Sequence, residues 1–512
     1  MISNASNKKI AKNTIFLYIR MLIKMLVSLY TSRIILNTLG IIDYGIYNVV
    51  GGIVILFGFI VGPMTISVQR FLSFELGKQQ DSNPKINIIF NMALYIHIIL
   101  AIIIFIIAES IGLSIFQNLQ IPEERMNAAM WVFHMSIITS CINILQIPYA
   151  GVIISHEKMD AYAYISIFEV ILKLGLAFFL LLIENYDKLI IYSILVFIAT
   201  LLTQSIYPIY CRIRIKSINY MKVWDKQIFK ELISFASWSL IGEIAWSSTG
   251  QGVNIVLNLF NSPIINAARG IAVQVMTSLN LFVLNFQTAI NPQIIKNYAN
   301  NQTEKVLELT IRGIKLSYFL MYIFSLPFLF NINYILKIWL GNVPEKTEIF
   351  CRLAIIGILC ETLSNLVTTV VKATGHIKNY QVITSLFLCL NLPLSYFSLK
   401  AGLNPESVYF VYIAISLILC IIRISFAKKI IGLTFHTYIK KIFLPITIST
   451  ISSVTITSIF YSLNNNSNLF PFIHSIICII ISIISIIIFG LSKEEKFFLR
   501  KKIPVVNKYL NK

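Results

Sequence analysis

Long apolar runs recur along the whole chain, and each is long enough to cross a membrane as an α-helix. A helix that crosses about 30 Å of hydrocarbon needs about 20 predominantly apolar residues. Runs of that length fall at residues 13–38, 43–71, 86–109, 126–148, 161–183, 188–211, 231–258, 264–292, 310–336, 349–373, 379–400, 405–427, 440–462 and 470–491. No stretch between them is long enough to bury a core of its own. The sequence therefore predicts an all-α polytopic membrane protein with about 14 transmembrane helices.

Charge is scarce and unevenly placed. Hydrophobic residues make up 57% of the chain and charged residues 12%, whereas soluble proteins carry roughly 25% charged residues. A net charge of +20 could indicate nucleic-acid binding. The Lys and Arg residues are, however, confined to short segments between apolar runs, which is the pattern of positive cytoplasmic loops. We therefore expect membrane lipids, and not nucleic acid, around this protein.

The basic residues also predict the orientation of the chain. If the N-terminus lies inside, the outside loops hold five basic residues, against thirty in the inside segments and the C-terminal tail. The five are Arg125, Lys188, Lys337, Lys346 and Lys400. Because Lys and Arg concentrate in cytoplasmic loops, we expect both termini and the 212–230 segment to face the cytoplasm.

Two short motifs indicate an internal repeat. Ser155-His156-Glu157-Lys158 follows the fourth apolar run, and Gly375-His376-Ile377-Lys378 follows the tenth. Gly52-Ile53 and Gly270-Ile271 occupy the second and eighth runs at a similar separation. Parallel repeats occur in transporters, with the substrate site at the repeat interface. The predicted domains are an N-terminal six-helix lobe at 1–211, a basic cytoplasmic linker at 212–230, a C-terminal six-helix lobe at 231–430, and two extra helices with a basic tail at 431–512.

Charged residues inside the apolar runs are the first candidates for function, because each is costly in a membrane. Arg20 and Lys24 lie four residues apart in the first run and so share one helix face, whereas Arg33 lies on the opposite face. Arg269 lies in the eighth run. One interpretation is a cationic substrate cavity suited to an anionic headgroup. The other is that Arg20 and Arg33 extend to the two membrane surfaces.

The 231–258 run carries a polar stripe at steps of three or four residues, which is the spacing of one helix face. The stripe consists of Ser239, Glu243, Ser247, Gln251 and Asn254. Such residues line a cavity or hold helices together. Glu243 lies near the middle of the run, so we expect it to line the cavity or to couple transport to an ion gradient.

Other acidic residues in the runs have different interpretations. Glu169 and Lys173 are four residues apart in the order that favours an ion pair, so we expect them to neutralise each other. Glu361 has no basic neighbour in the sequence, and a lining or coupling role stays open for it.

Several kinds of site are not expected. The seven cysteines include no close CxxC pair and are odd in number, which argues against a disulfide framework or a zinc site. The sequence has no nucleotide-phosphate loop, metal-ligand cluster or nucleophile motif. We therefore expect no cofactor, no metal, no catalytic residue and no ATP-driven transport by this chain.

Four stretches resemble one known family. They are Leu39-Gly40 followed by Asp43-Tyr44-Gly45-Ile46-Tyr47, Gln146-Ile147-Pro148-Tyr149-Ala150 through Lys158, Asn266-Ala267-Ala268-Arg269-Gly270, and Leu390-Asn391-Leu392-Pro393-Leu394. They are similar to the bacterial polysaccharide flippases, the O-antigen type transporters of the multidrug/oligosaccharidyl-lipid/polysaccharide (MOP) exporter superfamily. The resemblance runs over nearly the whole chain.

The resemblance implies a MATE-like fold, with two six-helix lobes around a central cavity and two further C-terminal helices. It implies that the protein moves undecaprenyl-diphosphate-linked oligosaccharide, an O-antigen or capsule repeat unit, from the inner to the outer leaflet of the bacterial cytoplasmic (inner) membrane. It also implies that Arg20, Lys24 and Arg269 face the cavity. Other polysaccharide assembly proteins are further expected partners.

Two alternatives differ from a flippase. A multidrug or cation antiporter of the same superfamily should line its cavity with acidic or aromatic residues, and the basic residues of the first and eighth runs count against it. A membrane polysaccharide polymerase or ligase should have one long outer loop. The longest outer loop here, Ser110 to Arg125, is short.

Overall fold

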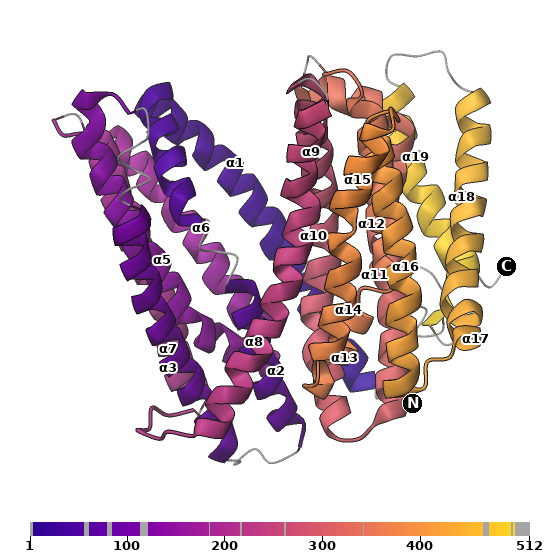
Figure 1. Cartoon of the computed structure of the whole chain (residues 1–512), viewed down its shortest axis with the longest axis horizontal. Helices are drawn as coiled ribbons and strands as arrows, with labels where there is room; N and C mark the ends of the chain where they lie inside the picture. The colour runs from indigo at the N-terminus through magenta and orange to yellow at the C-terminus, as the bar shows by residue number, and fades with distance from the viewer. Residues whose placement is uncertain are drawn as a thin grey trace, which may run out of the picture. The chain divides into compact units, whose positions relative to one another are not determined.

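The computed structural model describes residues 4–55, 61–78, 84–112, 121–183, 185–215, 218–260, 263–340, 343–463, 470–492 and 495–496. Within these residues all regular secondary structure is helical (Figure 1). The predicted all-α class is confirmed.

Eleven helices among the described residues are long and apolar enough to cross a membrane, and a bent helix pair raises the number to 12. They coincide with 12 of the predicted runs. The run at 43–71 passes through residues 56–60, which lie outside the described residues. The run at 231–258 is divided among α8 (Lys226–Ser247), a π-turn (Ser248–Gly252) and α9 (Val253–Phe260). Although α8 has 22 residues, it is too polar to be counted, because Lys230, Glu231 and Glu243 all lie within it.

The chain divides into two compact units. The first unit comprises Met1–Ile244, Thr288–Gln302 and Lys372–Gln381, and the second comprises Ala245–Gln287, Thr303–Val371 and Val382–Lys512. Each unit is described by itself below. The domain boundaries predicted from the sequence stay predictions.

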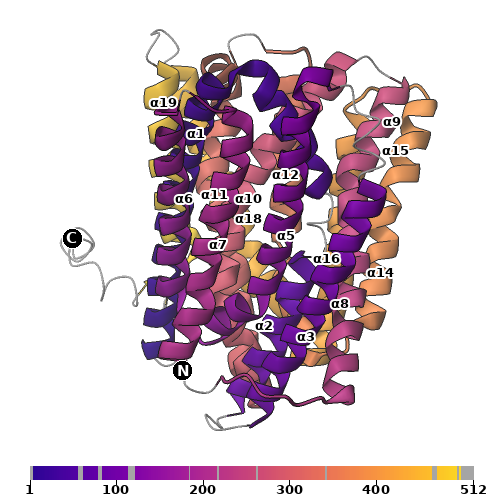
Figure 2. The same cartoon turned by 90° about the vertical axis from the view of Figure 1, so that its left-hand side faces the viewer.

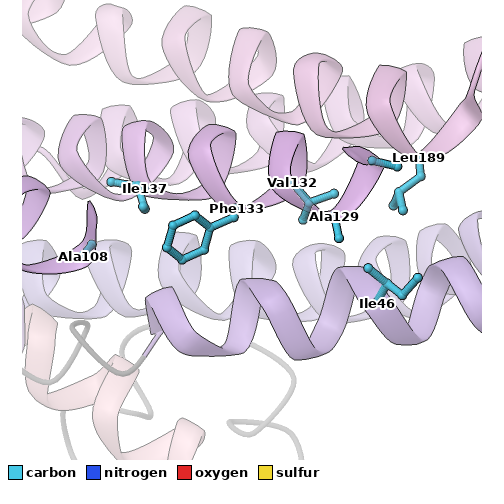
Figure 3. Packing of buried hydrophobic residues seen from close by; sticks show 8 residues of the cluster. Ile46, Ala108, Ala129, Val132, Phe133, Ile137 and Leu189 are labelled. Carbon is cyan, nitrogen blue, oxygen red and sulfur yellow. The ribbon is translucent and has the colours of Figure 1, made fainter. Parts of the chain in front are cut away.

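In the first unit, α1 (Asn4–Ile55) runs alongside α6 (Met159–Leu181), and α5 (Met126–Ser155) packs against three further helices (Figure 2). These three are α2 (Val61–Gly77), α3 (Pro84–Ile107) and α7 (Lys188–Arg214). Apolar side chains of α1, α5 and α7 meet in one cluster that includes Phe133, with Ile46 and Leu189 near Ala129 (Figure 3). α1 bends at Gly40, whose positive φ of 80° suits a residue without a Cβ.

Arg125 connects two segments at one end of this unit. Its guanidinium donates to Asp43 of α1 at 2.8 Å (Nε to Oδ1) and to Asp187 at 2.6 Å (Nη1 to Oδ2). Asp187 also accepts hydrogen bonds from the backbone N–H groups of Leu189 and Ile190 and thereby caps α7. Partial burial raises the pKa of Asp187, but the hydrogen bonds from Arg125 and the helix backbone outweigh it, so the pKa lies below its ordinary value.

The second unit is built around α11 (Thr303–Leu340), α12 (Thr347–Thr362) and α16 (Ser407–Ile431) (Figure 1). α12 packs against α11 and α16. Further helices of this unit are most of α10 (Pro263–Ala299), α13 (Val367–Thr374, through Val371), most of α14 (Lys378–Cys389), α15 (Asn391–Lys400), α17 (Phe435–Tyr438), α18 (Leu444–Leu463) and α19 (Phe470–Ser485).

The two loops with the repeated His-x-Lys motif each receive a basic side chain, and both contacts lie in the first unit. In the first loop, the Glu157 carboxylate accepts from Lys296 Nζ at 2.8 Å and from Gln293 Nε2 at 3.1 Å. Just before the second loop, the Ala373 carbonyl accepts from Arg70 Nη2 at 3.1 Å. Each loop is therefore bonded to a helix of the other half of the sequence.

Candidate functional site

Three basic side chains and one carboxylate gather on α1 and α6 of the first unit. Lys173 Nζ lies 2.6 Å from Glu169 Oε1, which is the ion pair expected from the sequence. Arg20 and Lys24 of α1 also lie within electrostatic reach of the Glu169 carboxylate. With three cations and one anion, this group, which we call the α1–α6 cationic cluster, carries a net charge of +2.

The guanidinium of Arg20 lies against an aromatic ring and has two buried donors without a partner among the described residues. Its Cζ lies 4.5 Å from the centre of the Tyr162 ring, a cation–π contact. Its Nε and Nη1 atoms are buried and have no hydrogen-bond partner among the described residues. The Lys24 side chain is exposed. The cluster can therefore offer hydrogen bonds and positive charge to an anionic group, and a substrate role for Arg20 and Lys24 stays a prediction.

Arg269 lies in the second unit and is bonded to the break between α8 and α9. Its Nη1 donates to the Gly250 carbonyl at 2.9 Å and to Asn254 Oδ1, and its Nη2 donates to the Thr249 carbonyl at 3.2 Å. The side chain is 5% exposed, and Nε has no partner among the described residues. Because a π-turn leaves carbonyls without their helical partners, Arg269 stabilises this break. Its predicted substrate contact is untested.

The predicted polar stripe is not one continuous face. The π-turn at Ser248–Gly252 adds a residue to one helical turn and so rotates the residues that follow it. Ser239 is buried, whereas Glu243 and Ser247 are exposed. Ser239 and Glu243 belong to the first unit, and Ser247 and Asn254 to the second. The side chain of Gln251 lies outside the described residues.

Glu243 forms no hydrogen bond or ion pair with any described residue, so the structure assigns it no partner. Asn254 of the stripe contacts another predicted site residue, Arg269.

Glu361 lies beside a break in a helix of the second unit. α12 ends at Thr362, and α13 follows with a bend of 42°. Tyr412 of α16 donates its hydroxyl to Glu361 Oε2 at 2.7 Å. Arg423 Nη1, also from α16, donates to Ser364 Oγ within the break at 3.3 Å. The Glu361 carboxylate and the Arg423 guanidinium therefore both lie at the break between α12 and α13.

The sequence interpretation missed Arg423, which is 6% exposed. Applying to it the rule used for Arg20 and Arg269, that a charge within an apolar run is a functional candidate, would have identified it.

The absence of a side chain at Gly357 leaves room for the Tyr412 ring. A Cβ at Gly357 would lie 2.5 Å from Cε1 of the Tyr412 ring. We therefore expect Gly357→Ala to displace that ring, to weaken its hydrogen bond to Glu361 and to destabilise the protein by about 1–3 kcal/mol. Thermal unfolding of the purified protein measures the loss. Gly175→Ala is the matched control, since nothing lies within 4 Å of a Cβ there. Equal melting of the two variants would contradict this packing.

One family model matches part of the chain. The MatE family model matches residues 240–397, which run from α8 into α15. No curated protein matches the chain.

Solved structures match over most of the chain. An outward-facing multidrug resistance MATE family transporter of the MOP superfamily has a TM-score of 0.70 at 12% identity, and the match covers 83% of this chain and 96% of that one. A MATE structure in the bent conformation has a TM-score of 0.70 at 14% identity, covering 85% and 97%. A MOP superfamily transporter from Pyrococcus furiosus, whose structure was described as having a binding pocket of reverse polarity that suggests a different function, has 0.70 at 12%, covering 83% and 96%. The chain therefore has the fold of the MATE transporters.

Proposed function

We propose that the protein is a membrane transporter of the MOP superfamily that moves a lipid-linked diphosphate oligosaccharide, an O-antigen or capsule repeat unit, between the leaflets of the bacterial inner membrane. The observation that carries this proposal is the α1–α6 cationic cluster. Its net charge of +2 lies within the two candidate membrane spans Lys12–Gly40 and Met159–Leu181. Both termini are assigned to the cytoplasm from the placement of the basic loops.

A diphosphate is the anionic group that suits this cluster. Guanidinium and ammonium groups form strong, charge-assisted hydrogen bonds with phosphate oxygens, and Arg20 retains unpartnered donors. A cationic drug would instead meet repulsion from Arg20, Lys24 and Lys173. The reverse polarity described for the pocket of the Pyrococcus furiosus transporter, which suggests a different function for that protein, supports the idea that one fold serves more than one function.

The second candidate is a multidrug or cation antiporter. The MatE family model and the similarity to multidrug transporters support it at least as well as they support a flippase. The Glu361 carboxylate, held by Tyr412 at the helix break, is a group that could attract a cation. Both candidates are transporters, and the fold supports either over a polysaccharide polymerase or ligase.

For coupling to an ion gradient we propose Glu361 ahead of Glu243. Broken helices in transporters commonly bind coupling ions, and Glu361 lies at such a break, whereas Glu243 is exposed and without a partner among the described residues. Glu243 stays the second candidate for this role.

Deleting the gene separates the two transport functions. A flippase deletion should remove the surface polysaccharide, measured on gels of cell extracts, and leave resistance to cationic drugs such as ethidium unchanged. A drug antiporter deletion should lower the inhibitory concentration of such drugs and leave the polysaccharide intact. The second pattern would overturn our proposal in favour of the antiporter.

A further inference from the structure

A cavity of about 750 Å³ opens in the first unit, and no residue of the α1–α6 cationic cluster lines it. It is lined by the end of α2, the start of α8 and the loop that carries Gly375-His376-Ile377-Lys378. All of these segments belong to the first unit. The cavity falls within the size range of small-molecule sites, about 300–1,000 Å³.

A buried arginine forms part of the wall of this cavity. Arg70 is 7% exposed, and its Cζ lies 4.5 Å from the Phe71 ring centre and 5.8 Å from that of Phe235. Its Nη2 donates to the Ala373 carbonyl, but its Nε has no hydrogen-bond partner among the described residues. Arg70 also forms no ion pair with a described residue. The wall of the cavity therefore holds a positive charge, with the Glu231 and Glu75 carboxylates within electrostatic reach of it.

Gly375 makes room for this guanidinium. A Cβ there would lie 2.5 Å from Arg70 Nη2, and its φ is +82°, a conformation that favours glycine. The repeated loop motif thus has a local role on the second loop, since its first residue allows the backbone to close over Arg70.

Two lysines and an indole form the rim. Lys230 and Lys378 are exposed, and Lys378 Nζ lies 5.2 Å from the Trp238 ring centre. Glu231 is the one carboxylate among the lining residues, and it accepts a hydrogen bond from Gln227 Nε2 at 3.0 Å. Arg70, Lys230 and Lys378 against Glu231 give the cavity a net charge of +2. It therefore favours an anion that also carries apolar surface.

We propose that this cavity binds the phosphate headgroup of an anionic phospholipid. Basic pockets between helices on the cytoplasmic side of membrane proteins bind such headgroups, and the cavity lies in segments whose basic residues place them on that side. The phosphate reaches Arg70 and the two lysines, while Trp238 and Phe235 cover the apolar part next to the headgroup. This assignment does not depend on which substrate the protein transports.

The test is lipid binding to the delipidated, full-length protein in mild detergent, followed by native mass spectrometry. The probes are phosphatidylglycerol, phosphatidylcholine and free glycerol phosphate. Lys230→Gln combined with Lys378→Gln should weaken phosphatidylglycerol binding roughly 25-fold, about fivefold for each basic group near an anionic surface. Glu231→Gln should strengthen it, because that change removes the opposing charge. Lys230, Lys378 and Glu231 are all exposed, so the fold should tolerate both variants.

Lys428→Gln combined with Lys429→Gln is the matched control. These lysines are also exposed, at the end of α16, and are not among the residues that line the cavity. The control should bind phosphatidylglycerol as the wild type does. Equal binding by the two double variants would overturn the site. If glycerol phosphate bound at the same concentrations as phosphatidylglycerol, the ligand would be a soluble anion and the lipid proposal would be wrong. If phosphatidylcholine bound as well as phosphatidylglycerol, the charge of the cavity would not determine binding.

Discussion

Replacing Arg20 and Lys24 together by alanine is expected to reduce transport at least about 100-fold while the protein remains in the membrane. Each charge-assisted hydrogen bond to a substrate phosphate contributes about 1.5–3 kcal/mol, so two lost contacts exceed a factor of 100. Lys24→Arg should retain more activity than Lys24→Ala, because the positive charge remains. Surface polysaccharide restored to a deletion strain measures the activity, and immunoblots of the membrane fraction measure the amount of protein.

Arg33→Ala is the matched control for this pair. Arg33 also lies on α1 and is exposed, but on the face opposite Lys24. It should complement the deletion as well as the wild type does. Full complementation by the double alanine variant at normal protein levels would show that the α1–α6 cationic cluster has no part in transport.

Glu157→Gln is expected to destabilise the protein by about 3 kcal/mol. The Glu157 side chain is 5% exposed and holds Lys296 at 2.8 Å. Removing one partner of a buried ion pair leaves the other charge uncompensated, which costs about 3–5 kcal/mol, and the partial exposure of Lys296 (22%) places this pair at the lower end. Thermal unfolding in detergent should show a fall in Tm of several degrees.

An exposed ion pair provides the comparison. Glu348 pairs with Arg352 four residues along α12 at 2.7 Å, and the two side chains are 32% and 44% exposed. Such pairs contribute about 0.3–0.5 kcal/mol, so Glu348→Gln should melt close to the wild type. If Glu157→Gln melts at the same temperature as Glu348→Gln, the contact between the first loop and Lys296 does not stabilise the fold.

The sequence predicted the helices well because a membrane helix is determined by a local property, the length of an apolar run. Twelve of the predicted runs coincide with candidate spans of the structure. The run that carries the polar stripe is interrupted by a π-turn, which composition does not reveal. One extra residue in the turn at Ser248–Gly252 changes the register of the helix; Gly250 and Gly252 weaken a helix there, but they do not specify a π-turn.

The candidate sites were predicted in part. Arg20, Lys24 and Arg269 became candidates because charge within an apolar run is conspicuous, and their role in a substrate site stays a prediction. The Glu169–Lys173 ion pair, expected from its four-residue spacing, is present. Arg269 bonds to carbonyls about 20 residues away, and Tyr412 bonds to Glu361 about 50 residues away. The sequence alone does not say which residues of two such separate segments lie side by side, so these contacts could not be predicted. The contacts of the two His-x-Lys loops were hidden for the same reason.

Transport by the purified protein in proteoliposomes tests the central claim most directly. An undecaprenyl-diphosphate oligosaccharide is placed in one leaflet, and its appearance in the other is followed with an impermeant lectin, under proton and sodium gradients in turn. Ethidium uptake is measured in the same vesicles. Our account predicts that the lipid-linked sugar crosses and ethidium does not, with Arg20→Ala/Lys24→Ala inactive. Gradient-driven ethidium transport without movement of the lipid-linked sugar would contradict it.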